Sequence, residues 1–223
     1  VHERPINGAP WMTYYAAIDP VEKGSTKTSD SRASIYVYMT SYSRTVDGKM
    51  SVQGNKLVAE WVGRYDDLDD TNEMLSMVVE WYNAFTMCES NKPSFIQHMR
   101  VKKRQRYMAR KSDMIFDKEV NQTSENIQFQ EYGVHMTEQL WSKLLEFAIE
   151  FLSEKISTKF RPDEAGEEKE ITTYGVERIP FVELIHEMQE YNPKGNWDRL
   201  KTFGILCGFI KAQQAKLGTI SRK

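Results

Sequence analysis

The stretch TYYAAIDP, from Thr13 to Pro20, is the part of the sequence that decides the fold. Apolar and aromatic residues lead up to a single aspartate, Asp19, and the run then stops at a proline, as in a buried strand that ends at a turn. A carboxylate in apolar surroundings costs several kcal/mol unless it is paired or takes up a proton. We therefore expect Asp19 to have a partner at the end of this strand, and a cation is one candidate.

Three further segments have the composition of strands. Ala33 to Thr40 is rich in β-branched and aromatic residues, Lys56 to Gly63 alternates, and Phe85 to Cys88 is a short apolar run. The intervening segment KMSVQGN, from Lys49 to Asn55, has the composition of a turn region. Modest loops join the first three strands, which indicates an antiparallel arrangement.

Apolar residues at helical spacing predict helices after these strands. The first would begin at Asp70, with Glu73 completing a capping box, and would end near Tyr82. Its expected core face carries Met74, Met77, Val78 and Trp81. Further helices are predicted over residues 91–101, from Thr137 as cap to about 158, over 180–191, and from about 196 onward, with a strand over 172–179. This order predicts an α/β domain whose mixed sheet is covered by helices.

The bulk composition is that of one globular domain. The chain has 223 residues, of which 40% are hydrophobic and 28% charged, and no apolar run approaches the roughly 18–20 residues of a membrane span. We therefore expect no membrane partner. Cys88 and Cys207 lie in apolar stretches and are interpreted as reduced core residues of an intracellular protein. We expect a lead-in over residues 1–12, the domain over 13–217 with a mobile surface insertion at 160–170, and a tail over 218–223.

Three carboxylates lie where a predicted strand ends or a predicted helix begins: Asp19, Glu89 and Asp198. If the first and fourth strands are neighbours, Asp19 and Glu89 approach closely, and at least one pKa rises unless a cation intervenes. Magnesium or manganese would suit them, because hard ions prefer carboxylate oxygens. With Asp198 from the last helix, the set would hold two ions, an arrangement used in phosphodiester hydrolysis.

Each of these acids also has a purely structural interpretation. Asp19 stands before a proline and can simply open a turn. Glu89 can be an exposed residue at a strand terminus, and Asp198 suits the positive end of a helix dipole. Spacing alone leaves both interpretations open.

A second charged feature is the segment VKKRQRYMARK, from Val101 to Lys111, which contains six basic residues and no acid. It is either a solvated face or a patch that follows DNA phosphates independently of sequence. The basic residues are Lys102, Lys103, Arg104, Arg106, Arg110 and Lys111. The chain has no G-x-x-x-x-G-K-[ST] motif, so we expect no ATP hydrolysis of that kind in it.

Several segments, taken in order, resemble the C-terminal nuclease domain of viral large terminase subunits, the DNA-packaging motors of tailed bacteriophages and related viruses. They are AAIDP, LVAEWVGR, DDTNEMLSMVVEWYNAFTMCES, YGVHMTEQLWSKLLEFAIEFL and YNPKGNWDRLKTFGILCGF. The most specific part is WYNAFTMCES, in which a Tyr-Asn pair precedes a short strand that ends in an acid. The resemblance covers about residues 13–209.

The resemblance implies an RNase H-like fold, with a mixed central sheet whose first three strands are antiparallel. It also implies metal-dependent cutting of concatemeric viral DNA during genome packaging. By the matched motifs, Asp19 would be the acid of the first strand, Glu89 that of the fourth and Asp198 that of the closing helix. Asp30 would be an accessory acid near the metals. Many relatives have a denser acidic cluster where this chain has Asp198 alone.

The partners that the resemblance implies are two Mg²⁺ or Mn²⁺ ions, double-stranded DNA, an ATPase domain preceding this one in the same full-length protein, the portal and the small terminase subunit. The setting would be the host cell cytoplasm. Two alternatives remain open at the level of sequence. One is another RNase H-like phosphoryl-transfer enzyme, of the resolvase or transposase type. The other is a non-catalytic docking module of a packaging motor.

Overall fold

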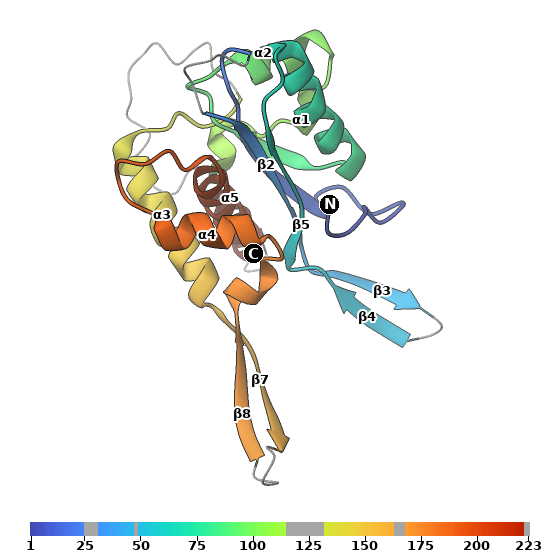
Figure 1. The fold of residues 1–223 in the computed structure, drawn as a ribbon. Coiled ribbons are helices and arrows are strands. Elements are labelled where there is room, and N and C mark those ends of the chain that lie inside the picture. Colours follow the sequence, from blue (N-terminus) through green and yellow to red (C-terminus); the bar gives the residue numbers. More distant parts are fainter. Residues whose placement is uncertain (25–30, 47–48, 115–131, 163–167, 221–223) are drawn as a thin grey trace.

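A four-stranded mixed sheet forms the centre of the computed structural model, which describes residues 1–24, 31–46, 49–114, 132–162 and 168–220 (Figure 1). Its order is β5-β2-β1-β6. The strands are β1 (Tyr14–Asp19), β2 (Ala33–Met39), β5 (Lys56–Gly63) and β6 (Phe85–Cys88). β2 pairs antiparallel with β1 and β5, and β6 pairs parallel with β1. The predicted α/β class and these four strands are confirmed.

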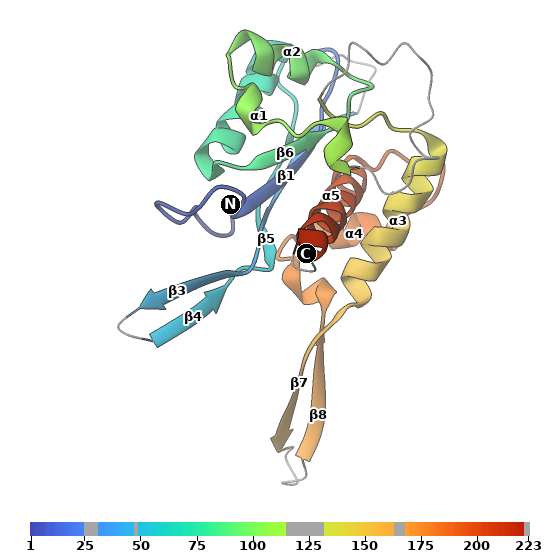
Figure 2. The ribbon, with the colours of Figure 1, turned by 180° about the vertical axis from the view of Figure 1, so that it is seen from behind.

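Helices cover both faces of the sheet, which explains why β1 is buried along its whole length (Figures 1 and 2). Successive side chains of a strand point to opposite faces. Tyr15 and Ala17 pack in one core with α3 (Glu138–Ser153), α4 (Val182–Glu190) and α5 (Asp198–Ile220). Tyr14, Ala16 and Ile18 pack in the other core with α1 (Leu68–Tyr82) and α2 (Ser94–Val101).

Two hairpins project from this body. The first pairs β3 (Tyr42–Val46) with β4 (Lys49–Gln53), so the turn expected over residues 49–55 is wrong for most of its length. Because β3 lies in this hairpin, the first three strands of the chain do not together form the antiparallel part of the central sheet. β5 pairs with β2 instead.

The second hairpin pairs β7 (Lys155–Pro162) with β8 (Glu168–Tyr174). The surface loop expected over 160–170 is therefore wrong at both ends, while 163–167 lie outside the described residues. The cross-strand backbone hydrogen bonds of the hairpin do not depend on core-forming side chains, which is why the polar composition did not reveal it. The strand expected over 172–179 stops at Tyr174, and a 3₁₀ turn, Gly175–Arg178, follows.

The structure corrects both the start and the buried face of α1. Its N-cap is Asp67 rather than Asp70, and the Asp67 carboxylate accepts a hydrogen bond from the Asp69 N–H at 2.7 Å. Buried apolar residues are Leu75, Val79 and Tyr82, whereas two members of the expected core face, Met77 and Trp81, are 47% and 49% exposed. Two apolar stripes of the same helical period lie side by side on α1, and the period alone does not say which of them meets the sheet.

The helices α3 and α5 pack against each other behind β1 and β2. Thr137 caps α3 as predicted, accepting a hydrogen bond from the Leu140 N–H at 3.1 Å. Gly204 of α5 faces α3, because a Cβ there would lie 3.1 Å from the Trp141 ring. Within the described ranges, no helix has the length and hydropathy needed to cross a membrane.

Candidate active site

Asp19 and Glu89 lie together at one end of the sheet. Asp19 ends β1, and Glu89 directly follows β6, the parallel neighbour of β1, with its N–H donating to the Ile18 carbonyl at 2.9 Å. Asp19 alternates in step with Ala17, and Glu89 with Met87, so both side chains lie on the α5 face. They are 0% and 2% exposed. The structure thus brings together the two acids that the sequence placed at strand ends.

Two lysines close over this pair of carboxylates. Lys92 Nζ lies 2.8 Å from Asp19 Oδ1 and 3.8 Å from Glu89 Oε2. Lys201 Nζ lies 2.5 Å from Glu89 Oε2 and 3.5 Å from Asp19 Oδ2. Burial lowers the pKa of Lys201, but the two carboxylates outweigh it and raise the pKa above its ordinary value, so Lys201 stays charged.

The sequence did not lead us to predict either lysine as a site residue, although the spacing of the two lysines from the acids could have indicated them. Each follows one of the predicted site acids by three positions, Lys92 after Glu89 and Lys201 after Asp198. Residues three apart on a helix share a face, which places Lys201 on the same side of α5 as Asp198.

Below about pH 7 the two buried acids hold one proton between them. Burial raises the pKa of Asp19 from 3.8 to about 7, the neighbouring Glu89 acts in the same direction, and the lysines oppose it. Burial would also raise the pKa of Glu89, but a hydrogen bond from Asp19 and the two lysines outweigh it and lower that pKa. The pKa values of Asp19 and Glu89 shift in opposite directions because the two groups titrate as a pair. Asp19, the more deeply buried acid, holds the proton.

Asp198 begins α5 at the same end of the sheet and is 8% exposed. Its Oδ2 accepts hydrogen bonds from the Arg32 N–H at 2.7 Å and from Asn196 Nδ2 at 3.3 Å. Burial raises the pKa of Asp198, the Arg32 N–H lowers it, and the charge of Asp19 raises it. Asp198 thus lies within electrostatic reach of Asp19, but one of its oxygens is held by the backbone before β2.

A side-chain network from α4 and β5 fixes the first turn of α5. Glu187 Oε2 accepts the N–H groups of Arg199 and Leu200, each at 3.1 Å. The Arg199 guanidinium in turn donates to Glu187 Oε1 at 3.2 Å and to Glu60 Oε1 at 2.9 Å. Because Asp198 and Lys201 belong to this turn, the network sets the position of both.

The carboxylate oxygens of Asp19 and Glu89 suit a divalent ion, but a third ligand is not grouped with them among the described residues. Asp19 Oδ2 and Glu89 Oε2 are buried and, within the described part of the chain, neither accepts a well-aligned hydrogen bond, although Lys201 lies near both as an ion pair. Carboxylate oxygens of this kind suit magnesium or manganese. Across the same described residues, however, no three His, Cys, Asp or Glu side chains are grouped so as to hold a metal. The role of Asp198 as a third ligand stays a prediction, and Asp30 lies outside the described residues.

The basic stretch is divided between structural and surface roles. Arg104 is tied to α1 by Glu73 at 3.1 Å and Glu80 at 2.8 Å, and its side chain is 20% exposed. Lys102 also pairs with Glu73, at 3.2 Å, but its side chain is 46% exposed. The Arg106 guanidinium lies over the Tyr107 ring at 4.6 Å. Lys103, Arg106 and Arg110 are exposed and Lys111 is partly exposed.

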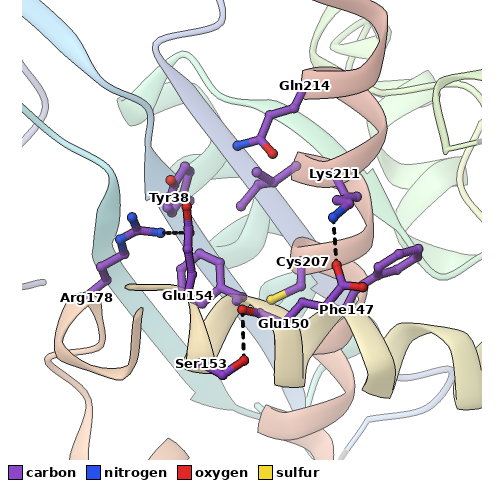
Figure 3. Close-up of a pocket in the computed structure, with 11 residues that line it drawn as sticks. Tyr38, Phe147, Glu150, Ser153, Glu154, Arg178, Cys207, Lys211 and Gln214 are labelled. Carbon is purple, nitrogen blue, oxygen red and sulfur yellow. Dashed lines mark hydrogen bonds and ion pairs between the residues drawn. The ribbon is translucent and has the colours of Figure 1, made fainter. Parts of the chain in front are cut away.

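A separate cavity of about 350 Å³ lies between α3, α5 and β2 (Figure 3). Tyr38, in its lining, pairs with Tyr15 near the start of β1, so the cavity is at the opposite end of the sheet from Asp19. In Figure 3 its charged groups point toward one another, with Arg178 donating to Glu154 at 2.5 Å. None of the predicted site residues lines it.

No family model matches the chain, and no curated protein matches it either.

Proposed function

We propose that this chain is the metal-dependent DNA endonuclease domain of a viral terminase large subunit. The convergence of Asp19 and Glu89 carries the proposal. Two buried carboxylates at the ends of adjacent parallel strands, with one pKa raised to about 7, are typical of a functional site rather than of a stabilising contact.

An RNase H-like fold is part of the proposal, and two features of the sheet support it. β5, β2 and β1 are successively antiparallel, and β6 then pairs parallel with β1. Beyond β6, a parallel bridge between Thr86 and Met108 extends the sheet by a further segment.

In the proposed reaction, Asp19 and Glu89 would hold one divalent ion, and Asp198 would contribute to a second. Ions bound there would supply Lewis acidity for hydrolysis of a phosphodiester bond. Lys92 and Lys201 balance the charge of the acids in the absence of metal. Once released from them, their ammonium groups are free to bind phosphate oxygens of the DNA. Lys102, Lys103, Arg106, Arg110 and Lys111 are the proposed contacts to the DNA backbone, whereas Arg104 is committed to α1.

Plasmid nicking in manganese tests the proposal. The wild-type chain should nick supercoiled DNA, and Asp19→Ala and Glu89→Ala should abolish nicking. Asp69→Ala, which removes an exposed carboxylate on α1, should leave it unchanged. Undiminished cleavage by Asp19→Ala would refute the assignment. A strong preference for branched junctions or for specific DNA ends would instead favour a resolvase or a transposase.

A docking module of a packaging motor is the second candidate, and one observation favours it. Lys92 and Lys201 already neutralise Asp19 and Glu89, so the fold tolerates the two acids without an ion. Calorimetric titration with manganese separates the two functions. Absence of binding, together with unchanged stability in Asp19→Ala, would favour docking over catalysis.

A further inference from the structure

A cleft of about 410 Å³ adjoins the candidate active site, with Glu89 and Lys201 in its wall. Three aromatic residues, Trp141, Tyr191 and Trp197, also line it. We call it the aromatic cleft. Its aromatic residues come from α3, from the end of α4 and from the residue before α5, so three separate elements bring rings to one place.

The rings of the aromatic cleft are held in place by their polar atoms. Trp141 Nε1 donates to Tyr191 Oη at 3.4 Å, and Trp197 Nε1 donates to the Asn192 carbonyl at 2.7 Å. Tyr191 lies between the two indoles, with ring centroids 6.4 Å from Trp141 and 6.0 Å from Trp197. A Cβ at Gly195 would lie 2.3 Å from the Trp197 ring, so only glycine lets the loop pack there. All three rings remain partly exposed.

The wall beside Glu89 is also fixed. The Asn91 side chain donates to the Met136 carbonyl at 2.9 Å and accepts the Met136 N–H at 2.6 Å. This pair of hydrogen bonds ties the turn after β6 to the segment that leads into α3. The turn that carries Glu89 and the segment that leads to Trp141 are therefore held together.

The chemistry of the aromatic cleft suits a nucleotide. A ligand that spans it meets flat aromatic surface at one end, and at the other a charged lysine beside the acids that would hold metal. A nucleotide has the same arrangement, because a flat base and an anionic phosphate are joined by one sugar. Bases stack on aromatic side chains with little regard for sequence, contributing about 5- to 150-fold in affinity each. A cleft of about 410 Å³ has room for one base.

We propose that the aromatic cleft binds one unstacked nucleobase of the DNA strand whose phosphodiester lies at Asp19 and Glu89. This inference rests on the proposed function and deepens it, because it makes locally opened or single-stranded DNA the substrate form at the cut. Extruding a base from DNA costs the free energy of unstacking, and this cost is lowest where the DNA is already single-stranded. The aromatic surface offsets that cost.

Binding measured without cleavage tests the inference. The wild-type chain in EDTA should bind an oligo-dT strand more tightly than a duplex of the same length, with quenching of tryptophan fluorescence. Trp197→Ala and Trp141→Ala should weaken strand binding by about 5- to 150-fold. Trp141→Phe should retain most of the affinity, since it keeps a ring. Trp81→Ala, on the opposite side of the sheet and 49% exposed, is the matched control and should bind as the wild type does.

A second measurement needs no variant of the protein. Replacing the bases of the strand one at a time by abasic sugars should reduce wild-type affinity sharply at one position. Uniform affinity across all abasic strands, or wild-type binding by a folded Trp197→Ala, overturns the inference. Ring-dependent strand binding without plasmid nicking would uphold the cleft and refute the nuclease. Nicking that is unaffected by abasic sites and by Trp197→Ala would support the nuclease and refute base binding in the cleft.

Discussion

Lys201 Nζ lies 2.5 Å from Glu89 Oε2, where the first turn of α5 meets the end of β6. The ammonium group thus occupies the surroundings that the sequence assigned to a cation. A buried pair of acids needs positive charge nearby, and this chain supplies that charge from its own side chains. Any divalent ion that binds Glu89 must first displace Lys201.

Replacing Lys201 by methionine should lower stability in the absence of metal and strengthen metal binding. About 1–2 kcal/mol of unfolding free energy should be lost, because the acids keep only Lys92, and the partial exposure of Lys201 limits the effect. Urea unfolding with and without manganese measures both quantities. Lys211→Met, which removes a surface pair with Glu150, is the control. Equal stabilisation of wild type and Lys201→Met by manganese would show that Lys201 does not compete with the ion.

The raised pKa of Asp19 predicts a particular pH dependence of stability. Below pH 3.8 the folded and unfolded chains both hold the proton, whereas between 3.8 and about 7 only the folded chain holds it. Stability therefore falls as pH rises through this window, by at most about 1.4 kcal/mol per pH unit from this group, and the loss is complete above the folded pKa.

The variant Asp19→Asn removes this proton, so its stability relative to the wild type should increase with pH between about 4 and 7. Chemical unfolding at several pH values measures the difference. A difference for Asp19→Asn that stays constant over this range would mean that Asp19 is ionised throughout.

The network at the start of α5 predicts that Glu187 supports the site from a distance. Glu187→Ala leaves the N–H groups of Arg199 and Leu200 without their acceptor and should cost about 1.5–3 kcal/mol of unfolding free energy. Glu183→Ala, on the exposed side of α4, should change it by no more than about 0.5 kcal/mol. Urea denaturation compares the two, and similar losses would show that the network does not anchor the helix.

The buried face of α1 can be checked by a pair of truncations. Leu75→Ala opens space in a fully buried position and should cost about 2–5 kcal/mol. Met77→Ala, at a residue that is 47% exposed, should cost less than about 1 kcal/mol. Thermal or urea unfolding decides between this face and the one that the sequence suggested, since the opposite ranking would place Met77 in the core.

The strands of the central sheet could be predicted from sequence because β-branched and aromatic runs bounded by polar turns are a local signal. The adjacency of Asp19 and Glu89 followed from one further step, the pairing of β1 with β6. The hairpins gave no such signal. Their backbone pairing does not need an apolar face, so the polar residues of β4 suggested a turn.

The remaining features of the site depend on tertiary contacts. The Asp198 carboxylate accepts a backbone N–H from Arg32, which lies 166 positions away, and no local pattern indicates that bond. The placement of Lys201 over the acids likewise arises only when α5 docks on β1, and that of Lys92 depends on the turn between β6 and α2. Spacing indicated which residues share a helix face, but not what that face meets.

The helix α5 contributes both to the candidate site and to the hydrophobic core. Asp198 and Lys201 are in its first turn, and Phe209, fully buried against Tyr15 of β1, lies about 16 Å further along the axis. A substitution at Phe209 that makes α5 rotate or shift along its axis would also move Asp198 and Lys201. Changes in the hydrophobic interior of this protein therefore also move the charged end of α5, and the two cannot vary independently.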